Sequence, residues 1–367
     1  MSKQNIFPLE RSLAVKGIAI CAMLFHHCFF KPSIYEGFSV RMFPFSEDLI
    51  TNVALFGKLC VGVFAFLSGY GLSIKWRTSR PEEKKRFFLS RYISTMSGYW
   101  FVFLACCSFY QFMDGRTVKT YCTGTVLENI TGVLMSFLGV SRLLGTPMLI
   151  YEWWYMSAAI LFILLVPVLY EAMDRMSALS VIVITALLPR MMGIAFLGGT
   201  HPLSFLMAAV LGVAFERNCL FDEIHRKLNI RRKTCKMLIV AFILFLTYKL
   251  YRRLPFEQYW EIKYAAVPIL VIICLNETVL NVSWIQRVLM FLGRHSMNMY
   301  LVHMVFLTYY KLFIFENRHF MVSWGILLLL SLSTSLLLEW VKKNIHWKRL
   351  ISIASQYVTV LLEKNNR

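Results

Sequence analysis

The sequence predicts an all-α, polytopic membrane helix bundle of about ten transmembrane helices with both termini in the cytoplasm. The chain of 367 residues is 58% hydrophobic and only 16% charged, which is more apolar surface than a soluble domain of this length can bury. The apolar residues form blocks of roughly 16 to 25, long enough for a membrane-crossing helix, whereas β-barrel strands would be short and alternating. Both the soluble and the barrel architectures are disfavoured.

Ten apolar blocks are predicted to cross the membrane. The first resembles a signal peptide, but it contains Lys16 and ends in His26 and His27 rather than at a small-residue cleavage site. We therefore expect it to be retained. The predicted spans are residues 12–30, 52–74, 92–113, 148–170, 178–197, 202–216, 237–252, 263–280, 286–306 and 321–341.

The basic residues predict the orientation of these spans. The formal net charge is +19, and Lys and Arg gather in short loops, where they favour the cytoplasmic side. Residues 75–91 and 217–236 carry seven basic residues each, and the tail after residue 341 carries six. All three segments are cytoplasmic only if the apolar stretch 125–140 does not cross the membrane. We therefore expect 125–140 to be interfacial or re-entrant.

The chain reads as one membrane domain, residues 8–341, followed by a cytoplasmic basic tail, residues 342–367. No internal repeat or polar linker indicates a second domain. The basic residues do not interleave with aromatic residues on a polar domain, so we expect no nucleic acid as a partner. The nine cysteines show no metal-ligand spacing, so we expect no bound metal.

Lys16 and His27 are ionisable residues inside the first predicted span. They are eleven residues apart, about 1,100° of helix rotation, so they share one helix face about 16 Å apart along the axis. An imidazole can act as a general base or an acyl-accepting nucleophile, and an ammonium can hold an anionic donor. The structural alternative is that Lys16 extends to the inner headgroups and the histidine marks the outer interface.

The second predicted span ends in Ser68-Gly69-Tyr70, small residues beside an aromatic one, and helix packing is the simplest role for them. The basic loop that follows contains Arg86 and Arg91. Both contribute to the topology signal, and both are also candidates to contact the phosphates of a cytosolic cofactor.

Glu152 lies among aromatic residues near the start of the fourth predicted span, directly before Trp153 and Trp154. Tryptophans are common at membrane interfaces. A carboxylate in this setting is a candidate to orient an imidazole or to bind a sugar hydroxyl while the aromatic faces stack on a sugar ring.

Ser296, Tyr300 and His303 recur at spacings of four and three in the ninth predicted span, so they share one helix face. This face either forms a polar network between helices or lines a reaction cavity.

Together these segments, over about residues 8–341, resemble the acyltransferase 3 family of integral membrane enzymes, which includes O-acetyltransferases of bacterial surface polysaccharides. The family shows a basic residue and a histidine separated by ten positions, a Ser-Gly-aromatic signature, a tryptophan segment and a late Gly-x-x-Ser-x-x-x-Tyr-x-x-His pattern. The matching positions here are Lys16 and His27; Ser68, Gly69 and Tyr70; Trp153 and Trp154; and Gly293, Ser296, Tyr300 and His303.

The resemblance implies a multi-pass acyltransferase of a bacterial inner or plasma membrane. Cytosolic acetyl-CoA is then the acyl donor, with no permanently bound cofactor, and the acceptor is a hydroxyl of an extracytoplasmic glycan or lipid-linked saccharide. Because of the resemblance, His27 is the leading catalytic candidate, with Glu152 beside it, and Lys16, Arg86 and Arg91 are expected to hold the donor. Ser68, Trp153, Trp154, Ser296, Tyr300 and His303 are expected to line the substrate path.

Two departures from the family pattern concern the donor site and the final transfer. Members often carry an Arg-x-x-Arg pair where the third span begins, but here Ser94 follows Arg91 at that spacing. Many members also carry an appended hydrolase-like domain, whereas here only the basic tail, residues 342–367, is expected after the membrane domain. The transfer is therefore expected to finish at the membrane domain or on a separate extracytoplasmic partner.

Two other classes of function use intramembrane polar residues. A transporter or flippase of a lipid-linked sugar would bind its cargo without chemistry, but the paired repeats and matched Gly/Pro breaks typical of transporters are not evident. A purely structural membrane subunit would leave the shared face of Lys16 and His27 unexplained.

Overall fold

The computed structural model describes residues 6–191, 198–228, 233–255 and 260–365, and these residues are almost entirely helical. Within these ranges there is no β-strand, only an isolated bridge between Arg41 and His319. This confirms the all-α class. The α-helices are α1 (Leu9–Phe29), α2 (Glu47–Gly57), α3 (Cys60–Thr78), α4 (Pro81–Lys85), α5 (Phe87–Asp114), α6 (Arg116–Tyr121), α7 (Val126–Phe137), α8 (Ser141–Leu144), α9 (Trp154–Arg175), α10 (Ala178–Met191), α11 (Leu206–Arg217), α12 (Leu220–Lys227), α13 (Lys233–Arg253), α14 (Val267–Glu277), α15 (Ser283–Tyr309), α16 (Lys311–Phe315), α17 (Phe320–Asn344) and α18 (Trp347–Asn365).

Shorter helical turns complete the fold. A turn, η2, leads directly into α9, η4 leads into α11, and a π-helical turn, η5, leads into α14. The turns are η1 (Pro32–Ile34), η2 (Tyr151–Trp153), η3 (Gly198–Thr200), η4 (Pro202–Phe205), η5 (Ile262–Ala266) and η6 (Val279–Asn281).

In the part of the chain that the structure describes, six helical segments are long and apolar enough to cross a membrane, or seven if the bent pair formed by Pro202–Arg217 and Leu220–Lys227 counts as one span. The six are Leu9–Phe29, Glu47–Thr78, Phe87–Asp114, Tyr151–Arg175, Ile262–Asn281 and Phe320–Asn344. The other predicted spans also fall on helices: 178–197 on α10, with residues 192–197 outside the described residues, 202–216 on η4 and α11, 237–252 on α13, and 286–306 on α15.

The predicted span 52–74 is not one continuous helix. It is divided between α2 and α3, with the break at Lys58 and Leu59. The amide nitrogens of Lys58 and Leu59 bond to carbonyl oxygens three residues earlier, at 3.2 and 3.0 Å, which tightens the last turn of α2. Gly57 lies against α1, where a Cβ would be 2.8 Å from the Ala22 carbonyl oxygen. The break therefore lies where this span meets α1.

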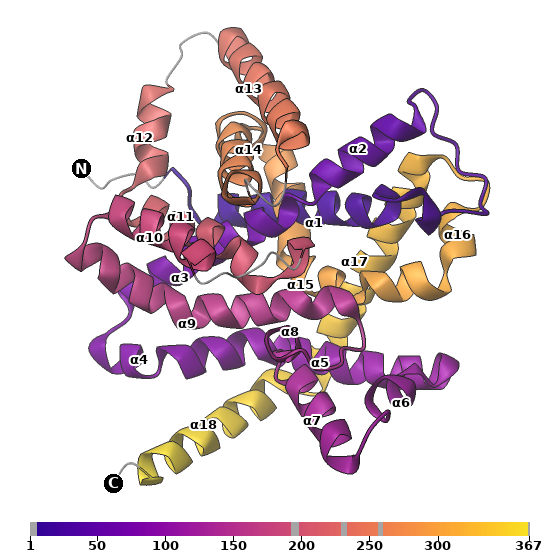
Figure 1. The fold of residues 1–367 in the computed structure, drawn as a ribbon, viewed down its shortest axis with the longest axis vertical. Coiled ribbons are helices and arrows are strands. Elements are labelled where there is room, and N and C mark those ends of the chain that lie inside the picture. Colours follow the sequence, from indigo (N-terminus) through magenta and orange to yellow (C-terminus); the bar gives the residue numbers. More distant parts are fainter. Residues whose placement is uncertain (1–5, 192–197, 229–232, 256–259, 366–367) are drawn as a thin grey trace.

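The stretch 125–140 contains α7, a helix of 12 residues and so about 18 Å long. This is shorter than the hydrocarbon core of about 30 Å that a single span must cross. The hydroxyls of Tyr121 and Tyr99 each donate a hydrogen bond at 2.8 Å to Ser136 of α7, to its hydroxyl and its carbonyl oxygen respectively. These bonds hold α7 against α5 and α6, below the centre of Figure 1.

The centre of the bundle is built on two helix pairs whose backbones touch. A Cβ on Gly293 of α15 would lie 1.9 Å from the Leu13 carbonyl oxygen of α1. A Cβ on Gly69 of α3 would lie 2.0 Å from the Ala209 carbonyl oxygen of α11. Only glycine permits such close approach, which is how small residues bring membrane helices together. These contacts place α1, α3, α11 and α15 at the centre of the molecule (Figure 1).

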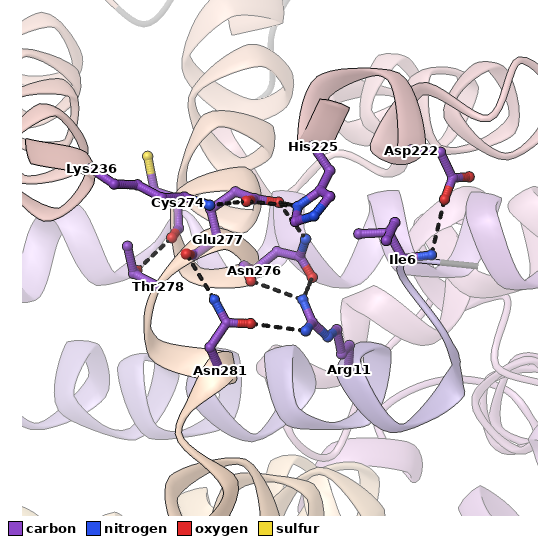
Figure 2. Close-up of polar contacts among 10 residues, drawn as sticks. All are labelled: Ile6, Arg11, Asp222, His225, Lys236, Cys274, Asn276, Glu277, Thr278 and Asn281. Atoms are coloured by element: carbon purple, nitrogen blue, oxygen red, sulfur yellow. Dashed lines mark hydrogen bonds and ion pairs between the residues drawn. The ribbon is translucent and has the colours of Figure 1, made fainter. Parts of the chain in front are cut away.

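A polar cluster around the carboxylate of Glu277, at the end of α14, joins three helices (Figure 2). The side chain of Glu277 is only 2% exposed. Its carboxylate accepts hydrogen bonds from Lys236 of α13 at 2.5 Å and from His225 of α12 at 2.9 Å. A buried carboxylate requires such partners, because an isolated charge in a low-dielectric environment is costly.

The same cluster includes the start of α1. Arg11 donates hydrogen bonds to the side-chain oxygen of Asn276 at 2.8 Å and to that of Asn281 at 2.9 Å (Figure 2). These partners are 265 and 270 residues away along the chain. Arg11 precedes Lys16 by little more than one helical turn, so these contacts also fix the position of Lys16.

The basic tail, residues 342–367, is helical over most of its length, since α17 continues to Asn344 and α18 follows it. Trp347, the first residue of α18, donates a hydrogen bond to the Ser97 carbonyl oxygen at 3.0 Å, and its ring lies 5.4 Å from that of Phe101. The start of the tail therefore packs on α5, from which α18 extends to the C-terminal end (Figure 1).

Neighbouring glycines of α3 provide a test of the backbone contact. Gly69→Ala should lower the free energy of unfolding by about 1–3 kcal/mol, because the methyl group would overlap the Ala209 carbonyl. Gly71→Ala is the matched control, since a Cβ there would have no neighbour within 4 Å. Removing a glycine from the helix should leave stability unchanged or raise it slightly. Melting curves of purified protein in detergent would show this, and equal melting temperatures for the two variants would contradict the packing.

The Glu277 cluster can be tested with Glu277→Gln. This change keeps the size of the side chain but leaves the Lys236 ammonium and the His225 imidazole without their carboxylate, which should cost about 3–5 kcal/mol. Glu223→Gln is the control, because Glu223 pairs only with Lys227 on the surface of α12 and should be neutral. Chemical denaturation would compare the variants, and a Glu277→Gln protein as stable as the control would show that the cluster does not hold these helices together.

Candidate functional site

A cavity of about 670 Å³ lies between α1, α3, α5, α9 and α15. Each of these helices contributes side chains, and the segment 199–200 and the break at residue 58 also reach it. The lining includes the polar and aromatic residues Lys16, His26, His27, Lys31, Lys58, Ser68, Ser94, Thr95, Tyr151, Glu152, Trp154, Tyr155, Thr200, Ser296 and Tyr300.

One wall of the cavity follows α1. Lys16, Met23 and His27 are seven and four residues apart on α1, and Lys31 follows four residues later, just beyond the end of the helix. Together they form a stripe that faces the cavity. The stripe from Lys16 to Lys31 covers fifteen residues, a rise of about 22 Å, most of the thickness of a hydrocarbon core. The predicted shared face of Lys16 and His27 is therefore the wall of a cavity.

The other walls bring together residues that are far apart in the sequence. Ser68 comes from α3, Glu152 and Trp154 from the start of the η2–α9 segment, and Ser296 and Tyr300 from α15. The Tyr300 hydroxyl donates a hydrogen bond to the backbone carbonyl of Glu152, which ties α15 to η2. Of the eleven site residues predicted from the sequence, these five join Lys16 and His27 on the cavity.

His27 has two other histidines as neighbours. Its ring centroid lies 5.1 Å from that of His26 and 4.7 Å from that of His303. Nδ1 of His26 donates to the Ala54 carbonyl at 2.8 Å, and Nδ1 of His303 donates to the Tyr300 carbonyl at 2.6 Å. A carbonyl only accepts, so both rings are fixed with the proton on Nδ1.

His27 itself makes no hydrogen bond to any other residue that the structure describes. No hydrogen bond within the described fold therefore occupies either nitrogen of its ring. A neutral imidazole in this position can accept a proton from a hydroxyl or receive an acyl group.

Two predicted path residues do not line the cavity. Trp153 points away from it, into an aromatic cluster where its ring lies 5.3 Å from Tyr99 and its Nε1 donates to the Leu301 carbonyl at 3.0 Å. His303 is fully buried behind His27, and its Nε2 has no hydrogen-bond partner among the described residues. Both side chains lie next to residues that do line the cavity, since Trp153 precedes Trp154 and the ring of His303 is 4.7 Å from that of His27.

The two arginines predicted to hold a donor are also outside the cavity lining. Arg86 is exposed between α4 and α5, and Arg91 is half-buried, with Nη2 3.5 Å from the Ser90 hydroxyl. Arg91 lies about one turn before Ser94 and Thr95, which do line the cavity, so it is beside that part of the wall.

Polar residues of α15 divide between two faces. Ser296 and Tyr300 face the cavity, whereas Asn298 donates hydrogen bonds to Ser335 at 3.2 Å and to Glu339 at 2.8 Å, both on α17. The predicted face therefore lines the cavity at Ser296 and Tyr300, and a polar network joins another face of α15 to α17.

Lys31 and Lys58 line the cavity near the histidines, but they are not among the site residues predicted from the sequence. Lys58 lies inside a predicted span, and an ionisable residue in a span is itself a signal of a functional site. No comparable signal marks Ser94, Thr95 or Thr200, which the fold alone brings to the cavity.

Among the described residues that line the cavity, the charged ones are Lys16, Lys31 and Lys58 and one carboxylate, Glu152. A cavity with this balance suits anionic ligands. In the part of the chain that the structure describes, no group of three His, Cys, Asp or Glu side chains is placed to hold a metal ion.

Comparison with known proteins identifies the family. A family model described as an acyltransferase domain, that of the acyltransferase 3 family, matches residues 14–340, which include every residue of the cavity. No curated protein and no solved structure matches the chain. The match extends over nearly the whole chain, so this protein belongs to the acyltransferase 3 family and is a membrane acyltransferase.

Proposed function

We propose that this protein transfers an acetyl group from cytosolic acetyl-CoA to a hydroxyl of an extracytoplasmic glycan or glycolipid. The observation that supports this proposal is the cavity along α1, which extends over about 22 Å from Lys16 to Lys31 and contains the unbonded imidazole of His27. A donor on one side of a membrane and an acceptor on the other can meet in such a cavity.

The proposed orientation has ten spans with both termini in the cytoplasm of a bacterial inner or plasma membrane. In this arrangement the basic segments 75–91, 217–236 and 342–367 all lie at the cytoplasmic side, as short basic loops generally do. The Lys16 end of the cavity is then the inner end, and the Lys31 end is the outer end.

The donor would bind at the inner end. Lys16 has no carboxylate within ion-pair distance among the described residues, so its ammonium is available to the phosphates of acetyl-CoA. Arg91, next to Ser94 and Thr95, and Arg86, on the exposed turn before α5, are placed to attract the same phosphates from the cytosol. The acetyl group would then extend along the stripe toward His27.

The chemistry would take place at His27. As a general base, one imidazole nitrogen removes the proton of the acceptor hydroxyl while its oxygen attacks the thioester carbonyl. The carbon–sulfur bond then breaks, and the thiolate of CoA leaves and takes up the proton. As an acyl carrier, the imidazole nitrogen attacks the thioester carbonyl first, the carbon–sulfur bond breaks, and the thiolate of CoA leaves. The acceptor hydroxyl then attacks this acetyl group, the carbon–nitrogen bond breaks, and the hydroxyl proton passes by way of the released imidazole to the thiolate.

The acceptor would bind near Glu152 and Trp154. The carboxylate of Glu152 can accept hydrogen bonds from sugar hydroxyls or orient the His27 ring, and an indole face can stack on a sugar ring. Tyr300 holds the backbone of Glu152 and so positions this wall. Membrane lipid would surround the outer surface of the helices. A separate extracytoplasmic partner would act after the acetyl group has left the cavity.

The role of His27 is tested with His27→Ala. Transfer of acetyl label from acetyl-CoA to surface glycans in membrane vesicles should fall by about 10²–10⁴-fold, the usual contribution of general base catalysis. His346→Gln, an exposed histidine of the tail region, is the control and should transfer label at the native rate. Vesicles must contain equal amounts of inserted protein. Label unchanged in His27→Ala would exclude the proposed role, and saccharide movement without label would favour a flippase.

The role of Lys16 is tested by comparing Lys16→Met with Lys16→Arg. Loss of one charge-assisted hydrogen bond should raise the KM for acetyl-CoA by roughly tenfold or more in Lys16→Met, whereas Lys16→Arg should retain most of the affinity. The KM for the acceptor should not change. A Lys16→Met enzyme with native donor affinity would show that this ammonium only anchors α1 in the membrane.

A further inference from the structure

The outer end of the cavity contains two lysines that the sequence motifs do not include. Lys31 follows the end of α1, and Lys58 lies at the break between α2 and α3. Neither ammonium lies within 4.0 Å of a carboxylate oxygen of any residue that the structure describes. Neither charge is therefore neutralised by an ion pair within the described fold.

Lys58 is held among neutral groups. Gly57 packs on α1, where a Cβ would lie 3.4 Å from Cβ of His26, so Lys58 enters the cavity next to this histidine. A Cβ on Gly199 would lie 2.5 Å from Nζ of Lys58, so the ammonium occupies space that a side chain at position 199 would require. The ring of Tyr264 is 5.9 Å from the same nitrogen, within the range of a cation–π contact.

Lys31 lines the same cavity as Lys58, and neither ammonium has a carboxylate of a described residue within 4.0 Å. Like charges repel more strongly in a partly buried site than in water, because the effective dielectric constant is lower. An anionic ligand that enters the cavity would remove this repulsion and supply the missing ion-pair partner.

Lys58 is also close to the reacting groups. Gly57, the residue before it, packs on His26, whose ring lies 5.1 Å from that of His27, and Lys58 and His27 line the same cavity. An anion bound to Lys58 would therefore share the cavity with the imidazole that is proposed to activate the acceptor hydroxyl. This position differs from that of Lys16, which is about 16 Å away from His27 along α1. The cavity thus has separate cationic groups at its two ends.

We propose that Lys58 and Lys31 bind an anionic group of the acceptor, a carboxylate or a phosphate on the saccharide, and so select acidic over neutral glycans. This inference rests on the proposed function and specifies the class of its acceptor. The anionic group anchors the saccharide at the outer end, and a neighbouring hydroxyl then reaches His27. Lys58 and Lys31 act on binding of the acceptor and take no part in the transfer of the acetyl group.

The test uses three matched oligosaccharides that differ in one terminal sugar: galacturonate, galactose phosphate and galactose. Binding to the full-length protein in detergent is measured by the change in tryptophan fluorescence, since Trp154 lines the cavity. Transfer of acetyl label and release of CoA are measured in vesicles with the same three saccharides. The native protein should bind one or both acidic saccharides about tenfold more tightly than the neutral one, as expected for a charge-assisted contact.

Variants assign this preference to the two lysines. Lys58→Gln should remove most of the difference between acidic and neutral saccharides, and Lys58→Arg should retain it. Lys31→Gln, an exposed substitution that folding should tolerate, should reduce the difference in part. Lys249→Gln is the control, because Lys249 is exposed on α13 and is not among the lining residues. The KM for acetyl-CoA should be the same in all four variants.

The outcomes separate this inference from the proposed function. Binding of only the carboxylated or only the phosphorylated saccharide would support the inference and identify the anionic group. Two results would overturn the inference if acetyl transfer still occurs. One is equal binding of all three saccharides, and the other is a preference for acidic saccharides that remains in the double variant Lys58→Gln/Lys31→Gln. A raised KM for acetyl-CoA in Lys58→Gln would also overturn it, by assigning Lys58 to the donor. Absence of both label and CoA release with every saccharide would instead contradict the proposed function.

Discussion

The site depends on the direct contact between the backbones of α1 and α15. Gly17 and Gly293 form this contact, and a Cβ on either would lie 2.0 Å or less from a carbonyl oxygen of the other helix. Side chains are thereby excluded from the interface, and the residues beside it must point elsewhere. Lys16 adjoins one glycine and Ser296 follows the other by one turn, and both face the cavity. The same contact that packs the helices therefore also orients the lining residues.

Within this framework, hydrogen bonds distinguish His27 from its neighbours. In a membrane, buried polar groups must find partners inside the protein, because lipid offers none. His26 and His303 each bond to a backbone carbonyl through Nδ1, and Nε2 of His303 has no partner among the described residues, whereas His27 has no hydrogen bond to any of them and faces the cavity. The three imidazoles are thus chemically different although they are close together. The neighbours restrict the position of the His27 ring and leave its nitrogens available.

The charges of the cavity follow a related logic. Two lysines elsewhere in the described fold have acidic partners, since Lys236 of α13 pairs with Glu277 of α14 and Lys342 pairs with Glu339 within α17. The first of these pairs joins two helices. The cavity lysines lack a carboxylate at ion-pair distance among the described residues, so no ion pair within the described fold neutralises their charge.

The sequence by itself determined the membrane class, the helical blocks and the shared face of Lys16 and His27. These features depend on composition and on the period of a single helix, which are local properties. Tertiary structure alone decided that Trp154 lines the cavity while Trp153 packs behind it, and that the second span breaks at Lys58. Adjacent residues on a helix point in different directions, and only the packing of distant helices determines which direction leads to a cavity. The same reason explains why Gly69 and Gly293 hold helices together while Ser68 and Ser296, in the same two motifs, face the cavity.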